Sequence, residues 1–310
     1  MDIIIVCHTE FGLVRNKKVI ADKRAISGAR EGVINLVEVA EKYGAKISFA
    51  VCPEVAEYFP KNINHEIGLH IHPGWEEYKT EGIKFIAGDE YLRKNCKQSF
   101  TSTVLRDYSY IEQSEMIKKG KERIVKTFGI SPKFFVAGRW CVNNNTIKAL
   151  VENDFTHECS APAHSISDHY DWSKLPRICM PYHPDKNNYQ KKGTEPILIL
   201  PISQYFPLGN VNPEVVPLTG LSWLKASFME YYKQGVPLFH ICLHSPSMTD
   251  RYFISAMEDF ISFISKHKGI NFKFASQIKE YEVKDYKTNI LPYLFSLNWK
   301  IVKKFLLKLI

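Results

Sequence analysis

The segment Gly68 to Trp75 reads Gly-Leu-His-Ile-His-Pro-Gly-Trp and holds two histidines, His70 and His72, two positions apart. Residues i and i+2 of a β-strand point to the same face, so both imidazoles would project together. Histidine is the commonest metal ligand, and two converging rings supply half of a tetrahedral zinc site. The segment therefore indicates a metal or catalytic site. The alternative is two ordinary strand histidines, one buried and one solvated.

Other apolar runs of the chain also end in polar residues. These ends are His8-Thr9-Glu10, Gly138-Arg139-Trp140, Pro201-Ile202-Ser203-Gln204 and Leu243-His244-Ser245. Each alone fits a cap or a solvated loop. Functional groups of α/β folds converge at the carboxyl ends of parallel strands, so five polar clusters at such ends indicate one shared site.

The elements that must position these residues alternate between strand and helix. Strands are expected at 3–7, 47–51, 67–71, 134–137, 197–200, 238–243 and 272–274, and helices at 28–43, 110–128, 145–153, 222–234 and 252–266. The continuous apolar runs predict strands buried on both faces, and the alternation predicts a parallel sheet, open or closed into a barrel. From Glu158 to Pro217, prolines and polar residues dominate. We expect this stretch to line a site rather than to form a second domain.

Composition limits the class of protein. The chain has 310 residues, 45% of them hydrophobic, which is enough for a large α/β core. Its net charge of +8 is concentrated toward the C-terminus, and without a basic stripe a nucleic-acid partner is not expected. Seven cysteines without a Cys-x-x-Cys pair favour a reducing compartment over a disulfide framework. With no signal peptide and no apolar span visible, we expect a cytoplasmic protein.

Five segments, in order, resemble motifs of the polysaccharide deacetylase family, the NodB-homology carbohydrate esterases. The resemblance is closer to a branch associated with surface-glycan and O-antigen biosynthesis. The segments are His8-Thr9-Glu10, Gly68 to Trp75, Phe135 to Trp140, Asp171-Trp172-Ser173 with Pro181-Tyr182, and Leu243-His244-Ser245. Each motif is short, and their order and spacing make the set specific.

The resemblance implies a distorted (β/α) barrel of about seven parallel strands. It also implies metal-assisted hydrolysis of an N-acetyl group on a sugar, which needs a base for the water and an acid for the leaving amine. By motif match, Glu10, His70 and His72 are the expected ligands of a divalent ion, with zinc as the expected metal. Arg139 stands where the family has the arginine that orients its base, and His244 stands where it has the acid.

Two features depart from the family. His8 stands where the branch has an aspartate. A neutral imidazole accepts a proton, so His8 is the expected base; the alternative is Glu10 as base with His8 as a ligand. The two histidines are also two residues apart, where the commoner family form has four, although strand geometry allows both to bind. A barrel with altered metal binding, a different acyl group or no catalysis therefore stays open as an alternative.

Aromatic residues near the predicted strand ends suit a carbohydrate, although loop packing is the alternative for each. The expected substrate-binding residues are Trp75, Trp140, Asp171 and Tyr205. Four other histidines match no zinc spacing and are expected to be loop residues: His157, His164, His169 and His183.

The sequence predicts a barrel over residues 1–285 and a basic amphipathic helix over 286–310. From Tyr293 onward, Lys300, Lys304 and Lys308 share one helical stripe, and Trp299 and Phe305 belong to the apolar remainder. Such a helix suits a bilayer interface, here the inner membrane surface, or a partner groove. The alternative is a terminal helix packed on the barrel.

Together these patterns predict a metal-dependent hydrolase that removes an N-acyl group, expected to be N-acetyl, from a sugar. Because no signal peptide is visible, we expect the substrate to be a nucleotide- or lipid-linked sugar of surface-polysaccharide assembly. The competing hypothesis is a deacetylase-like barrel that binds a glycan without turnover or acts on a different acyl group.

Overall fold

The computed structural model describes residues 1–20, 25–73, 104–207, 209–282 and 284–296. Seven parallel strands form its main sheet, in the order β10-β7-β6-β5-β4-β1-β11. Their bounds are β1 Asp2–Thr9, β4 Ile47–Val51, β5 Glu66–Ile71, β6 Phe134–Ala137, β7 His157–Pro162, β10 Leu198–Ile202 and β11 Leu238–His244. A short strand, β12 (Asn271–Phe272), also pairs with β1.

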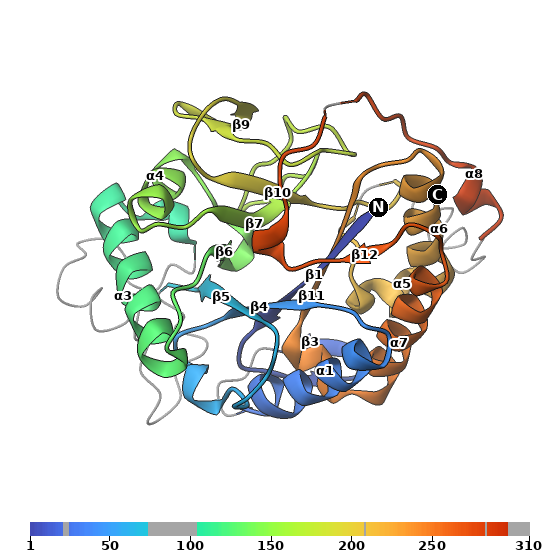
Figure 1. Ribbon diagram of the computed structural model, residues 1–310, viewed down its shortest axis with the longest axis horizontal. Helices are drawn as coiled ribbons and strands as arrows, with labels where there is room; N and C mark the ends of the chain where they lie inside the picture. Colours follow the sequence, from blue (N-terminus) through green and yellow to red (C-terminus); the bar gives the residue numbers. More distant parts are fainter. Residues whose placement is uncertain (21–24, 74–103, 208, 283, 297–310) are drawn as a thin grey trace.

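The edge strands β10 and β11 meet through Ser203, which follows β10. The Ser203 amide donates to the His240 carbonyl at 3.1 Å, and the His240 amide donates to Ser203 Oγ at 2.9 Å. This contact makes the sheet a nearly closed barrel, so the predicted distorted (β/α) barrel is confirmed. Helices surround the sheet in Figure 1: α1 Val33–Lys42, α3 Tyr110–Phe128, α4 Asn144–Glu152, α6 Leu221–Lys233 and α7 Arg251–Ser265.

Most predicted elements are confirmed within one or two residues, because local signals mark their ends. Ser109 accepts from the amide of Glu112, and the Glu112 carboxylate accepts from the amide of Ser109, so a capping box begins α3. Gly129 ends α3 in the left-handed conformation, with φ +70°. The helix predicted at 28–43 is divided into a π-helical turn, Gly28–Gly32, and α1.

Strand β7 was not predicted, and His157 lies in it rather than in a loop. The polar residues Glu158 and Ser160 interrupt the apolar run that would indicate a buried strand in the sequence. In the barrel all six residues of β7 are buried, and Ser160 Oγ accepts a hydrogen bond from the amide of Ala137 on β6. Two hairpins were also not predicted: β2 (Leu13–Arg15) with β3 (Lys18–Ile20), and β8 (Pro184–Asp185) with β9 (Asn188–Lys192).

Alternation along the strands divides the core into two. Outward residues of β1 such as Ile3 and Ile5 pack with helix residues in the larger cluster. Inward residues fill the barrel in a second cluster: Ile4, Val6, Ala50, Phe134, Val136, Cys159, Leu198, Leu200 and Leu238, with Ala275 and Ile278. Because the period is two, His8 lies on the inward face of β1 with Ile4 and Val6, and His70 lies on the inward face of β5.

The end of the described chain differs from the predicted helix 286–310. Residues 284–290 are not helical, and α8 covers only Leu291–Leu294. Residues 297–310 lie outside the described residues. Among the described residues, no helix combines the length and the apolarity needed to cross a membrane.

A buried ion pair fixes this end to the barrel. Arg177 pairs with the fully buried Glu230 of α6, and Arg177 Nη1 also donates to the Gln204 carbonyl at 3.0 Å. The Glu230 carboxylate accepts from the amide of Asn289 at 2.8 Å and from the hydroxyl of Tyr293 at 2.6 Å. These bonds, rather than helical periodicity, decide the path of residues 284–293.

We predict that Glu230→Gln lowers the free energy of unfolding by about 3–5 kcal/mol, because the variant leaves the Arg177 guanidinium buried without its counterion. Chemical denaturation followed by circular dichroism measures the change. Glu152→Gln removes an exposed carboxylate from α4 and serves as the control, with little effect expected. Equal stabilities of the two variants would show that the buried pair does not hold this end of the chain.

Candidate active site

Neighbouring strands deliver the candidate residues to one rim of the barrel. Thr9 on β1 is in register with Val51 on β4, and Val51 is in register with Leu69 on β5. The residues that follow Thr9, Val51 and Leu69 are Glu10, Cys52 and His70, and they therefore lie in one row at the carboxyl ends of the strands. On the other side of β1, His8 is in register with His244 of β11.

The three expected metal ligands come together. Glu10 Oε2 lies 3.3 Å from His72 Nε2 and 3.6 Å from His70 Nε2, and all three side chains are buried. His70 Nδ1 is 2.9 Å from the carbonyl oxygen of Val136, which can only accept, so Nδ1 carries the proton. His70 Nε2 then keeps its lone pair, and it has no hydrogen-bond partner among the described residues.

Gly138 explains how the His72 ring fits. A Cβ at position 138 would lie 2.3 Å from His72 Nδ1, which is closer than any real contact. Glycine is therefore required there for the imidazole to occupy the space beside β6. This requirement ties the Gly-Arg-Trp segment to the His-x-His segment.

The electrostatics leave these groups in the protonation states that metal ligands need. Burial alone would raise the pKa of Glu10, but the imidazoles of His70 and His72 hold it well below its usual value. Burial lowers the pKa of His72 to about 3. At neutral pH, Glu10 is a carboxylate and His72 is a neutral imidazole, which are the forms that bind a divalent cation.

Cys52 joins this group, although no sequence motif marks it. One ligand atom each of Glu10, Cys52 and His70 lie within 4.8 Å of one another, and all three residues are buried. Only its position in the sequence could have indicated Cys52. It directly follows β4, and the strands on both sides of β4 supply predicted ligands.

His8 lies between the metal-ligand candidates and His244. Its ring centroid is 4.9 Å from that of His70 and 4.8 Å from that of His244. Burial, reinforced by the neighbouring imidazoles of His244 and His70, holds the pKa of His8 well below its usual value. His8 is thus neutral, and its Nε2 has no hydrogen-bond partner among the described residues.

His244 has a carboxylate partner, Glu214, that no sequence motif marks. Its Nδ1 is 2.8 Å from Glu214 Oε2, and its amide donates to Glu214 Oε1 at 2.7 Å. Burial alone would lower the pKa of His244, but the charge and hydrogen bond of Glu214 raise it to about 9. Glu214 lies in a short 3₁₀ turn, Pro213–Val215, within a stretch of sequence that carries no catalytic motif.

Arg139 and Trp140 occupy a strained turn after β6. Both are left-handed, with φ 55° and 54°, a conformation that is uncommon for residues other than glycine. The carbonyl of Trp140 accepts from Trp172 Nε1 at 3.1 Å, and Arg139 Nη1 is 3.3 Å from His169 Nε2. The Trp140 ring meets His8 edge-on at 6.5 Å. The segment 163–173 therefore holds the turn in place.

The three other residues predicted to bind substrate, Trp75, Asp171 and Tyr205, differ in where they lie. Trp75 lies outside the described residues. Asp171 accepts from the amide and hydroxyl of Ser173 at 2.9 and 2.7 Å, so its carboxylate closes a turn. Tyr205 is buried and packs over Gly209, where a Cβ would meet its ring at 2.2 Å. Within the described part of the chain, no hydrogen bond or ring contact links Asp171 or Tyr205 to Glu10 or His70.

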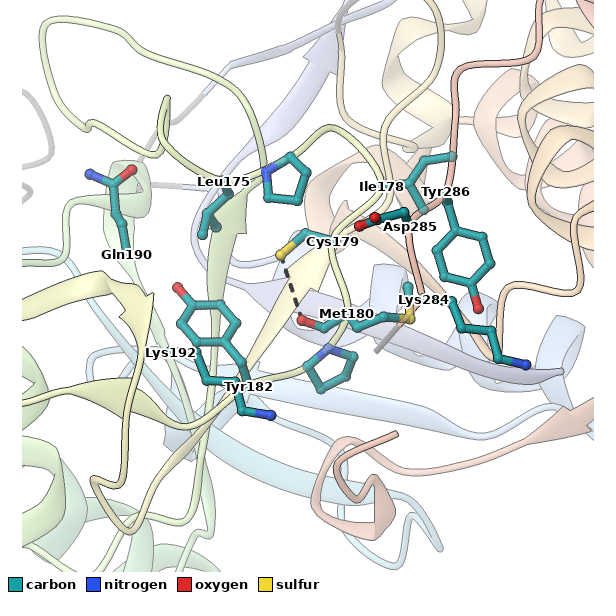
Figure 2. A pocket seen from close by; sticks show the side chains of 12 residues that line it. Leu175, Ile178, Cys179, Met180, Tyr182, Gln190, Lys192, Lys284, Asp285 and Tyr286 are labelled. Carbon is teal, nitrogen blue, oxygen red and sulfur yellow. Dashed lines mark hydrogen bonds between the residues drawn. The ribbon is translucent and has the colours of Figure 1, made fainter. Parts of the chain in front are cut away.

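A separate pocket lies between the segment 175–182 and residues 284–286 (Figure 2). The residues that line it include Leu175, Ile178, Met180, Lys284 and Tyr286. None of the candidate catalytic or metal-binding residues lines this pocket. It is distinct from the barrel rim that holds His8, His70, His72 and His244.

No family model matches the chain, and no curated protein matches it in sequence. Solved structures are similar in fold. A protein of Mycobacterium smegmatis assigned as a polysaccharide deacetylase aligns with a TM-score of 0.56 at 15% identity, covering 89% of this chain and 87% of that one. A protein of Pseudomonas aeruginosa PAO1 with the same assignment aligns with a TM-score of 0.56 at 16% identity, covering 89% and 88%.

An allantoinase aligns equally well, with a TM-score of 0.56 at 16% identity and coverage of 89% and 88%. At these identities the similarity concerns the fold. The chain thus has the (β/α) barrel fold found in these polysaccharide deacetylases and in the allantoinase.

Proposed function

We propose that the protein is a metal-dependent hydrolase that removes an N-acyl group, most simply N-acetyl, from a sugar. The observation that carries the proposal is the buried group of Glu10, His70 and His72 beside two further histidines, His8 and His244, at one barrel rim. The fold similarity to polysaccharide deacetylases supports the same chemistry.

The residues present fit a divalent ion. Glu10 Oε2 and His70 Nε2 are buried polar atoms without a hydrogen-bond partner among the described residues, and they face each other across 3.6 Å. Buried polar atoms are normally paired, so an ion between them would complete their interactions. Glu10, His70 and His72 would hold it, and when bound it would polarise the acyl carbonyl and the attacking water.

His8 and His244 suit the two proton transfers of amide hydrolysis. The neutral His8 would accept a proton from the attacking water, because its Nε2 is buried and available. His244 would donate a proton to the leaving amine, because Glu214 keeps it protonated up to about pH 9. Glu214 is a positioning residue, since its bond to Nδ1 leaves Nε2 of His244 to face the substrate.

Arg139 and Trp140 would complete the site from the turn after β6. The indole nitrogen of Trp140 is buried without a hydrogen-bond partner in the described part of the chain, so it is available to a sugar hydroxyl. Its ring and that of His8 meet edge-on with centroids 6.5 Å apart, so a sugar bound at Trp140 would lie next to the proposed base.

The allantoinase similarity favours a second candidate function, hydrolysis of an amide that is not attached to a sugar. His8 stands at the position of the proposed base, where the resembling motif has an aspartate. A barrel that binds a glycan without turnover, or that removes a different acyl group, is therefore a further alternative. These alternatives share the rim and differ in what reacts there.

We predict that His244→Ala lowers the rate of acetate release from N-acetylated sugars by a factor of about 10²–10⁴, the usual contribution of a general acid. A panel of free, nucleotide-linked and lipid-linked N-acetyl sugars identifies the substrate class. His183→Ala is the matched control, because His183 bonds to the carbonyls of Glu195 and Ile197 outside the rim. Unchanged turnover in folded His244→Ala would exclude His244 as the acid. Release from non-sugar amides alone would favour the second candidate.

The pH dependence tests the pairing of Glu214 with His244. The acid form of His244 is present below its pKa of about 9, so activity should fall as pH rises through this value. Glu214→Gln removes the charge that raises this pKa while burial still lowers it. We expect the alkaline limb of the kcat profile to move toward neutral pH in the variant. A limb at the same pH in both proteins would contradict the assignment.

We also propose that the end of the chain contacts an anionic membrane surface, which would favour a lipid-linked sugar as the substrate. Exposed apolar side chains gather at α8: Ile290 at 46%, Leu291 at 56%, Leu294 at 49% and Phe295 at 90% exposure. Tyr293, between them, is held inward by Glu230. The sequence continues through residues 297–310 with four lysines and no acidic residue, which is complementary to anionic lipid.

We predict that Leu294→Ser/Phe295→Ser weakens binding to anionic vesicles, measured by co-sedimentation, and that added salt weakens binding of the unaltered protein. The control is Ile111→Ser, which removes a 71% exposed apolar side chain from α3. Binding that is absent at low salt, or equal in all three proteins, would overturn the membrane proposal.

A further inference from the structure

Cys52 stands at a position where three strand ends converge. It directly follows β4, the strand that lies between β1 and β5 in the sheet. Its amide donates to the carbonyl of Thr9 at 3.0 Å, which fixes its backbone beside Glu10. The register of β4 with β5 then places Cys52 next to His70.

The side chains at these strand ends form a compact donor set. One ligand atom each of Glu10, Cys52 and His70 lie within 4.8 Å of one another, and the three residues are 6%, 3% and 1% exposed. Cys52 is a free cysteine.

A buried cysteine is usually only a small apolar side chain. What distinguishes Cys52 is its surroundings, since Glu10 Oε2 and His70 Nε2 are both buried without a hydrogen-bond partner among the described residues. Other buried cysteines have different neighbours. Cys141, for example, accepts from the amide of Leu105 and donates to the carbonyl of Gly138.

We infer that Cys52 Sγ is a direct ligand of the divalent ion, bound together with Glu10 and His70. The inference rests on the proposed metal-dependent function and extends it. His72, 3.3 Å from Glu10, would then be a further ligand or would orient the Glu10 carboxylate.

A thiolate ligand changes which metal the site selects. Thiolate and imidazole favour zinc and chemically similar ions, whereas magnesium, calcium and manganese prefer oxygen donors. One thiolate and one carboxylate also balance the charge of a divalent ion within a buried site. The site should therefore take zinc or cobalt(II) and should not bind magnesium at comparable concentration.

Cobalt(II) gives a direct test, because a cobalt–thiolate bond produces a charge-transfer absorption in the near ultraviolet that histidine and carboxylate ligands do not. We expect the full-length protein loaded with one equivalent of cobalt(II) to show this band. Cys52→Ser should lose the band, and zinc competition should bleach it in the unaltered protein. Cys159→Ser is the matched control, because Cys159 is equally buried on the inward face of β7 and should keep the band.

A second measurement does not depend on a variant that folds. X-ray absorption of the zinc-loaded unaltered protein should show a sulfur neighbour at about 2.3 Å. Metal bound with only nitrogen and oxygen neighbours, or a cobalt band that persists in folded Cys52→Ser, would overturn the role of Cys52 and leave the metal site intact. If neither zinc nor cobalt(II) binds, and the unaltered protein and His70→Ala do not differ in metal content, the metal-dependent function itself fails.

Discussion

The site depends on the register of four adjacent parallel strands, β11, β1, β4 and β5. In a parallel sheet, side chains at positions in register on neighbouring strands point to the same face. The hydrogen-bonded ladder therefore determines which side chains lie next to one another. The ladder pairs His8 with His244 and brings Glu10, Cys52 and His70 into neighbouring positions. A slip of one residue in any strand would turn its polar group outward among the helices.

Placing so many polar side chains inside a barrel carries a desolvation cost, and the pairings at the rim offset it unequally. His244 gains a full carboxylate partner in Glu214, and its pKa rises. Burial, together with the imidazoles of His244 and His70, lowers the pKa of His8, and the charge of Glu10 offsets this only in part. Two histidines in contact are therefore driven to opposite protonation states, the arrangement that acid–base chemistry uses to separate an acid from a base.

Contacts elsewhere in the barrel close its opposite end and join its two edge strands. Ala275 and Ile278 join the apolar cluster inside the barrel, and Ser48 and Glu66 bind the backbone of residues 275–276. At the junction of β10 and β11, His240 Nδ1 lies 3.1 Å from the carbonyl of Leu200, so even the incomplete edge is bonded. The bonds of Ser48 and Glu66 close the end of the barrel opposite the rim, because both residues lie at the amino ends of their strands, and the His240 contact joins the two edge strands.

The sequence by itself determined the strands with continuous apolar runs, the capped helices and the position of His8, His70 and His244 at the ends of strands. These follow from local periodicity and capping, which need no knowledge of distant residues. Tertiary structure alone decided the rest. Strand β7 is polar in sequence and becomes a strand because both of its faces are covered, and Cys52 and Glu214 reach the site only through contacts between separate segments. No short pattern marks such residues, because their neighbours in space lie far away in the chain.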